Sequence, residues 1–171
     1  MPTSAFAVDY LSAEQAQKLL FPGAVSFVEK TYSLSNDQLQ SIAKLGRTNA
    51  RSSAWKVTQA LDATGKILGA FVIDNVIGKY ELITYAVAID TTGAIKGIEI
   101  MSYRESHGGE IRMPAWRKQF VGKTSKDDLQ VGSDIALISG ATLSSKNVTD
   151  GVRRISAILD TIGDQWKKPL T

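Results

Sequence analysis

The spacing of apolar residues in the first third of the chain predicts two helices. In residues 12–21 and again in residues 36–45, apolar side chains recur every three or four positions, as on a helix with one buried face. Ser12 is placed to cap the first helix, and Ser35 or Asn36 the second, because these side chains accept hydrogen bonds from the free N–H groups of a first turn. We therefore expect the chain to begin with a helical part.

From residue 55 onward the apolar period changes to two, which predicts strands. Four such segments follow one another, at residues 55–61, 66–74, 80–89 and 94–103. Turns that end in Gly65 and Gly93 join them in pairs, as in β-hairpins. The nearly unbroken apolar run at residues 68–73 is typical of a strand covered on both faces. The pattern predicts an antiparallel β-sheet of two consecutive hairpins, packed with helices.

The last third of the chain returns to helical spacing. Residues 104–112 are polar and are expected to form an exposed loop, and residues 114–121 a short helix. A longer helix is predicted to begin near Ser144 or Ser145. Its apolar stripe comprises Val148, Val152, Ile155, Leu159 and Ile162, whereas Asn147, Asp150, Arg153 and Arg154 are expected to face water.

Length and patterning together predict a single α+β domain. A chain of 171 residues is long enough to bury a core of its own. We expect an N-terminal tail at residues 1–10 and one domain at residues 11–165. Within that domain, residues 11–50 form the helical N-terminal part and residues 55–160 the core that carries the functional site.

Composition excludes several classes of function. The chain has no cysteine and one histidine, which excludes thiol catalysis, iron–sulfur clusters and histidine-rich metal sites. Its net charge of +3 at pH 7 is mild and its basic residues do not cluster, which argues against nucleic-acid binding. No apolar stretch approaches the length of about eighteen residues that a transmembrane helix needs. We predict no catalytic constellation, no metal site and no membrane-spanning segment.

A run of small and hydroxyl-bearing residues precedes the last helix. The run comprises Ser139, Gly140, Ala141, Thr142, Leu143, Ser144 and Ser145. At the start of a helix, free N–H groups and the helix dipole favour a phosphate, to which Ser144 and Ser145 can donate hydroxyl hydrogen bonds. No His, Asp or Lys lies within three residues of Thr142, so no sequence neighbour activates its hydroxyl. A plain N-cap at Ser144 and Ser145 explains the same pattern without a ligand.

The run resembles the Ser/Thr-Gly-Ala-Thr motif of the FMN-binding domain family. This family includes the flavin-carrying subunits of the sodium-pumping NADH:quinone reductase and of related ferredoxin:NAD reductase complexes. The resemblance extends over residues 80–155, with an aromatic-Gln-Phe-x-Gly-Lys pattern at residues 116–123. Residues 11–23 are similar to stand-alone exported members of the family.

The resemblance implies a covalent flavin. It places FMN on Thr142 as a phosphate ester, attached by a Mg-dependent transferase that takes FMN from FAD. It also implies an electron carrier rather than a stand-alone enzyme. The expected redox partners are a membrane or periplasmic reductase, or multihaem cytochromes.

The same resemblance places a loop against the isoalloxazine ring, here formed by His107, Gly108, Gly109, Glu110 and Ile111. Two glycines let the backbone approach a flat ring closely. The imidazole of His107 titrates near neutrality and is a candidate to supply a proton to the flavin, although an exposed loop histidine without that role is the simpler interpretation.

Other residues have both a functional and a structural interpretation. Tyr80, Tyr85, Tyr103 and Trp116 are candidates to flank the ring, but aromatic residues in such segments more often belong to the core. Arg112 and Lys146 are candidates to pair with a phosphate, or are ordinary surface charges. Glu99, Asp127 and Asp128 are interpreted as solvated charges.

One position departs from the family's motif. The motif has an Asp six residues before the modified threonine, which the transferase recognises; Ala136 stands there, and Asp134 lies two residues earlier. Either Asp134 is sufficient for recognition, or modification is weakened or abolished. Two alternatives to a covalent flavin therefore stay open. The chain binds FMN or another phosphate ligand without a covalent bond, or it is a flavin-free scaffold subunit of a redox complex.

The N-terminal residues give an indication of the protein's cellular location. Ala5-Phe6-Ala7 has the small-x-small form that precedes a signal-peptidase cleavage site, and no charged or long apolar segment precedes it. Together with the exported relatives, this leads us to expect a periplasmic or otherwise extracytoplasmic protein whose signal peptide has been removed. A native N-terminus without a leader is the alternative interpretation.

Overall fold

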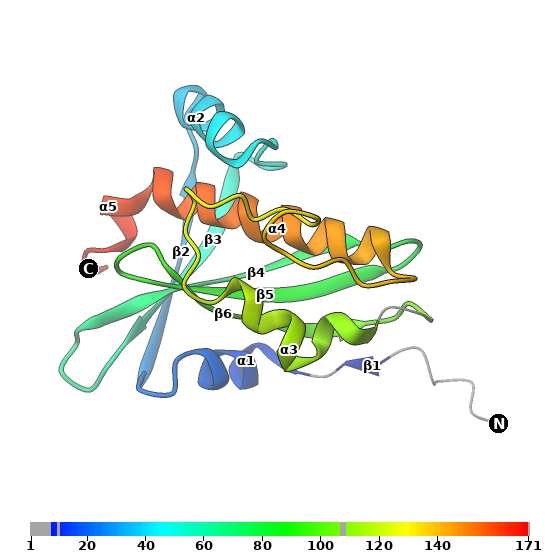
Figure 1. Cartoon of the computed structure of the whole chain (residues 1–171). Coiled ribbons are helices and arrows are strands. Elements are labelled where there is room, and N and C mark those ends of the chain that lie inside the picture. The colour runs from blue at the N-terminus through cyan, green and yellow to red at the C-terminus, as the bar shows by residue number, and fades with distance from the viewer. Residues whose placement is uncertain (1–7, 10, 107–108, 171) are drawn as a thin grey trace.

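The computed structural model describes residues 8–9, 11–106 and 109–170. They form a six-stranded antiparallel sheet in the order β1-β6-β5-β4-β3-β2. The strands are β1 (Val8–Asp9), β2 (Ser26–Ser33), β3 (Ala54–Leu61), β4 (Ile67–Ile77), β5 (Leu82–Asp90) and β6 (Ile95–Tyr103). The expected α+β class, with an antiparallel sheet and packed helices in a single domain, is confirmed (Figure 1).

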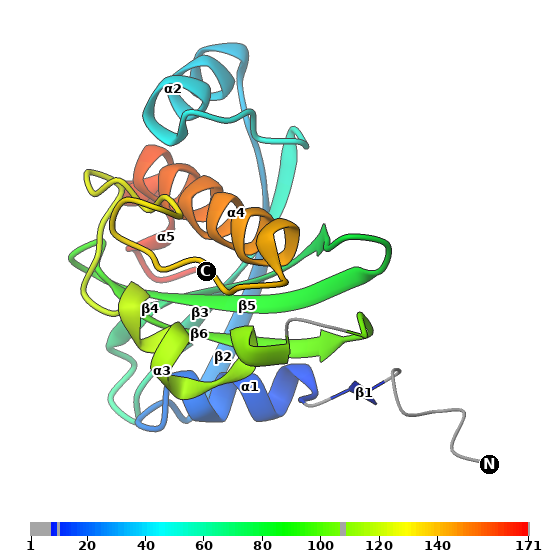
Figure 2. The same ribbon diagram turned by 45° about the vertical axis from the view of Figure 1, so that its right-hand side comes forward.

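Helices cover both faces of this sheet. The α-helices are α1 (Ala13–Leu20), α2 (Asn36–Gly46), α3 (Pro114–Arg117), α4 (Thr142–Thr161) and α5 (Gly163–Trp166), and the 3-10 turns are η1 (Gly109–Arg112) and η2 (Lys118–Phe120). The long helix α4 runs along one face with α2 outside it, and α1 lies against the opposite face (Figures 1 and 2). No helix in the described residues has the length and apolarity that crossing a bilayer requires.

Successive side chains of the central strands point to opposite faces of the sheet, and both faces are covered. Phe71 packs with the α1 side of the core, whereas its neighbours Ala70 and Val72 pack with the α4 side. The prediction of a doubly covered strand at residues 68–73 is therefore confirmed up to Val72; Ile73 is 38% exposed. The four predicted strands correspond to β3–β6, with ends shifted by a few residues.

The N-terminal part differs from the expectation of helices alone. Both helices and their caps are confirmed, because Ser12 and Ser35 each form a capping box with the glutamine three residues later. Between them lies the strand β2, which pairs with β3 along its whole length. The apolar pattern missed β2 because it is an edge strand in which only Tyr32 is buried.

The polar face expected for α4 is partly wrong. Arg153 and Arg154 are each only 7% exposed, because α2 and the segment that follows it pack over this side of the helix. Arg153 donates from Nε to the carbonyl of Gly46 at 2.6 Å and from Nη1 to that of Leu129 at 2.7 Å. The two arginines therefore fasten α4 to the α2 layer instead of facing water.

Candidate functional site

The first turn of α4 presents an exposed threonine. Gly140 adopts a φ of +81°, which turns the chain into the helix, and Ala141 occupies the N-cap position without a side-chain cap. The first helical hydrogen bond runs from Ser145 N to Ala141 O at 3.0 Å. Helix geometry therefore leaves the N–H groups of Thr142, Leu143 and Ser144 without an intrahelical acceptor. Thr142 itself is exposed at the first helical position.

Two serines of the run do not act as expected. The helix begins at Thr142, so neither Ser144 nor Ser145 is its N-cap. Ser145 is fully buried, and its hydroxyl donates to Ala141 O at 2.7 Å and accepts from Ile138 N at 3.3 Å. This hydroxyl holds the preceding loop and is not available to a phosphate, which corrects that prediction. Ser144 is 3% exposed and faces the cavity described next.

A cavity of about 320 Å³ opens beside the first turn of α4. One wall is the segment from Gly140 to Ser144, and the opposite wall consists of Lys79 and Tyr80 at the tip of the β4–β5 hairpin. Glu105 and Ser106, which follow β6, complete the lining. Segments far apart in the sequence thus converge on Thr142, whereas Ser139, also exposed, lies outside the lining.

Glu105 fixes the hairpin tip against the rest of the domain. One oxygen of its carboxylate accepts hydrogen bonds from the backbone N–H groups of Tyr80 and Glu81, the latter at 2.7 Å. Partial burial raises the pKa of Glu105, but the hydrogen bonds from these N–H groups and the nearby charge of Lys79 outweigh it and hold that pKa below its ordinary value. Glu105 therefore helps to fix the position of the hairpin tip.

The hairpin tip also contacts α4 directly. Asn147 donates from Nδ2 to the carbonyl of Ile77 at 2.6 Å. A Cβ on Gly78 would lie 2.8 Å from Oε1 of Glu105 and 2.9 Å from Oγ of Ser144, so only glycine fits between them. The position of the tip relative to Thr142 is thus set by packing on both sides.

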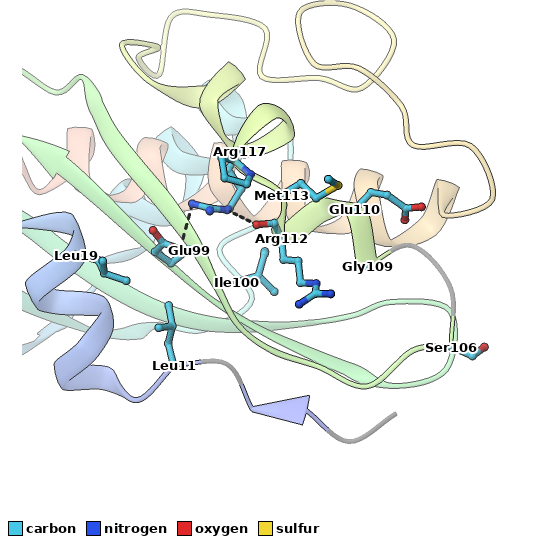
Figure 3. A pocket seen from close by; sticks show the side chains of 11 residues that line it. Leu11, Leu19, Glu99, Ile100, Ser106, Gly109, Glu110, Arg112, Met113 and Arg117 are labelled. Carbon is cyan, nitrogen blue, oxygen red and sulfur yellow. Dashed lines mark hydrogen bonds and ion pairs between the residues drawn. The ribbon is translucent and has the colours of Figure 1, made fainter. Parts of the chain in front are cut away.

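The loop expected to lie against the ring is only partly described. His107 and Gly108 lie outside the described residues. Gly109 and Glu110 begin the turn η1 and line a different cavity, of about 810 Å³, between α1 and α3 (Figure 3). Ile111 is fully buried in the core, so the expectation of an exposed loop up to residue 112 is wrong there.

Several side chains with two interpretations can now be assigned. Tyr85, Tyr103 and Trp116 are core residues, and Tyr80 is the one of these four ring candidates that is exposed, at 76%. Glu99 forms an ion pair of 3.1 Å with Arg117 in the larger cavity and is not simply solvated (Figure 3).

The remaining charges are held within loops or helices. Asp127 accepts from Thr124 N at 2.8 Å, and Asp128 accepts from the Ser133 hydroxyl at 2.5 Å. Lys146 pairs with Asp150 at 2.7 Å along α4. In the part of the chain that the structure covers, no group of three or more metal-binding side chains is found.

Asp134, two residues before the motif position occupied by Ala136, is engaged within its own loop. Its carboxylate accepts hydrogen bonds from Leu129 N and Gln130 N and pairs with Lys123 at 3.5 Å. Burial raises the pKa of Asp134, but these hydrogen bonds and the charge of Lys123 lower it by more, so the pKa lies below its ordinary value. The same contacts hold the carboxylate in its own loop. Ala136 is exposed, and its backbone is fixed by hydrogen bonds with Gln119 and Trp116.

Comparison with known proteins finds a family model that matches the part of the chain that forms this site. The model of the FMN-binding domain matches residues 78–157, which contain the hairpin tip, Glu105 and the first turn of α4. The Na(+)-translocating ferredoxin:NAD(+) oxidoreductase complex of Acetobacterium woodii has a subunit, designated G, that is 34% identical over 84 residues. That match covers 44% of this chain and 39% of the relative, so it spans well under half of the relative's length.

Solved structures agree at the level of the fold. NqrC of Shewanella oneidensis is similar with a TM-score of 0.54 at 20% identity, over 95% of this chain and 82% of that one. The Na(+)-translocating NADH-quinone reductase of Parabacteroides distasonis has a subunit, designated C, that gives a TM-score of 0.53 at 16% identity, over 94% and 86%. The sequence match to the FMN-binding domain thus covers residues 78–157, the part of the chain that carries the candidate site, and the solved structures agree with it in fold.

Proposed function

We propose that this chain is an extracytoplasmic electron carrier that holds FMN as a phosphate ester on Thr142. The observation that carries the proposal is the exposed hydroxyl-bearing residue at the first position of α4, facing a cavity inside the FMN-binding domain. When bound, FMN supplies the capacity to accept and donate one or two electrons. The protein supplies its position and surroundings.

The residues present fit a phosphate at Thr142. The N–H groups at positions 142–144 and the positive end of the α4 dipole favour a negative charge there. Lys79 adds a cation on the opposite wall. The cavity volume of about 320 Å³ lies at the lower end of the range of roughly 300–1,000 Å³ typical of ligand sites. The chain therefore offers hydrogen-bond donors, positive charge and space for a phosphate.

Attachment needs a separate enzyme. Thr142 has no His, Asp or Lys within three residues, and the nearest lysine on α4, Lys146, is paired with Asp150. We infer that a flavin transferase uses FAD as donor: the Thr142 oxygen bonds to the FMN phosphorus, AMP leaves, and the threonine proton passes to the transferase or solvent.

The relatives support a proposal about redox partners. The relatives from Acetobacterium woodii and Parabacteroides distasonis are subunits of Na(+)-translocating oxidoreductases. We propose that the chain exchanges electrons with a membrane or periplasmic reductase, or with a cytochrome, outside the cytoplasm.

Intact mass tests the attachment. The chain is co-expressed with a flavin transferase and weighed under denaturing conditions, which remove any ligand that is not covalently bound. We expect a gain of about 438 Da, the formula mass of FMN less one water. Thr142→Ala should lose this gain, and Thr91→Ala, which removes an exposed hydroxyl from the β5–β6 turn away from the motif, should keep it. An adduct that survives Thr142→Ala would overturn the assignment of the residue.

Non-covalent binding remains the second candidate because of Ala136. The motif's acidic residue is missing, and Asp134 is held elsewhere by Lys123. Yellow protein that releases its colour on denaturation, with no mass gain, would support this alternative. Colourless protein even in the presence of the transferase would support a flavin-free scaffold.

A further inference from the structure

Lys79 and Tyr80 project from a rigid support into the cavity beside Thr142. Figures 1 and 2 show the β4–β5 hairpin reaching the beginning of α4. Gly78 N donates to Glu81 O at 2.8 Å, which closes the tip, and the contacts with Glu105 and Asn147 hold it from both sides. The backbone of the tip is therefore fixed while these two side chains remain open to solvent.

An exposed aromatic residue at this position is unusual for the chain. The other described tyrosines, at positions 32, 85 and 103, are at most 3% exposed, whereas Tyr80 is 76% exposed. Its ring makes no contribution to either side of the core. An aromatic ring on a fixed backbone loses little freedom when another flat ring stacks on it, so it forms an effective binding platform.

Lys79 supports the ring and adds charge. Its Nζ lies 5.1 Å from the centre of the Tyr80 ring, within the range of a cation–π interaction. Both residues line the same cavity as Thr142. A planar ligand held between them and α4 would therefore meet an aromatic face together with a positive charge.

We propose that Tyr80 stacks against the isoalloxazine ring of the FMN on Thr142, and that Lys79 favours the reduced, negatively charged flavin. This assignment rests on the function proposed above. It gives the hairpin tip a specific role: Tyr80 orients the ring, and Lys79 raises its reduction potential because a nearby cation stabilises the added negative charge.

Flavin fluorescence distinguishes this contact from mere proximity. A phenol in contact with an excited flavin can reduce it and quench its emission, whereas phenylalanine and leucine cannot. In protein whose FMN adduct has been confirmed by mass, Tyr80→Phe and Tyr80→Leu should both increase flavin fluorescence several-fold. Visible circular dichroism of the flavin should persist in Tyr80→Phe, which keeps a stacking ring, and weaken in Tyr80→Leu.

The charge is tested separately. Lys79→Gln should lower the reduction potential of the bound flavin, and Lys66→Gln, at an exposed turn outside the domain match, should leave it unchanged. Urea unfolding should be unaltered in all four variants, since none removes a buried side chain.

Two failures have different meanings. A flavinylated Tyr80→Leu protein with unchanged fluorescence would overturn the stacking assignment and leave the attachment at Thr142 intact. Absence of the mass adduct from the wild-type chain would overturn the attachment, and with it this assignment.

Discussion

The hydroxyl of Tyr85 lies so close to the backbone of Gly151 that a Cβ on Gly151 would stand 2.0 Å from it. Tyr85 is fully buried, and its hydroxyl donates to Oδ2 of Asp74 at 2.7 Å. The ring is therefore held in place and cannot yield to a larger neighbour. This contact limits how closely α4 can approach β5. It therefore helps to position Thr142 at the start of α4.

Replacing this glycine should destabilise the domain. Gly151→Ala should lower the free energy of unfolding by about 1–3 kcal/mol, because overpacking outweighs the gain in helix propensity of about 1 kcal/mol. Urea denaturation measures the change. Gly163→Ala is the control, because the nearest atoms to its new Cβ belong to the flexible Lys167 side chain. Equal loss of stability in both variants would contradict the packing argument.

Arg153 should contribute more to stability than Lys146, although both pair with Asp150, at 3.0 Å and 2.7 Å. Arg153→Ala leaves the buried carbonyls of Gly46 and Leu129 without their donors. We expect a loss of about 1–3 kcal/mol in the free energy of unfolding, the usual cost of unsatisfied buried polar groups. Lys146→Ala removes an exposed partner of the same aspartate and should cost less than about 1 kcal/mol. A similar cost for both would show that the contacts with the α2 layer contribute little.

Helices and strands could be predicted from the sequence where one of their faces is buried, because apolar residues then recur at a regular spacing. Strands β3–β6 alternate or run apolar because they form the centre of the sheet, and Ser12 and Ser35 mark helix starts by local chemistry. The edge strand β2 leaves no such trace, since its side chains are mostly exposed. The buried state of Arg153 depends on α2, more than one hundred residues earlier, which no local pattern encodes.

The candidate site, too, could be predicted from the sequence only in part. The prediction that Thr142 carries the flavin rests on seven consecutive residues, whereas the buried role of Ser145 becomes visible only once the helix start is known. Tyr80 was one of four aromatic candidates, and only burial separates it from the three core residues. The role of Glu105 depends on amides about 25 positions away, so sequence reasoning assigned it none.

The support that Glu105 gives to the hairpin tip should depend on pH. Because the folded-state pKa of Glu105 is lowered, its contribution to stability is complete above the ordinary value of 4.5 and is lost as the pH falls through the folded-state pKa. Wild-type protein should therefore be more stable than Glu105→Gln at neutral pH, and the difference should disappear in acid. Urea titrations across this pH range measure it.

Glu81→Gln controls for the loss of a negative charge at the same tip, because its side chain is exposed. A difference between wild type and Glu105→Gln that persists unchanged in acid would show that the carboxylate's ionisation is not what fastens the tip.

Restoring the acidic residue of the motif should increase flavin attachment. Ala136 is exposed and its backbone is already fixed by Gln119 and Trp116, so Ala136→Asp should change stability by less than about 0.5 kcal/mol. We expect a larger fraction of the chain to gain the FMN mass on co-expression with the transferase, since the recognised carboxylate is then six residues before Thr142. Leu137→Asp adds the same charge at a neighbouring exposed position and should bring no increase. If the wild-type chain is already fully modified, or if both variants respond alike, Ala136 is not what limits the reaction, and the case for non-covalent binding loses its structural basis.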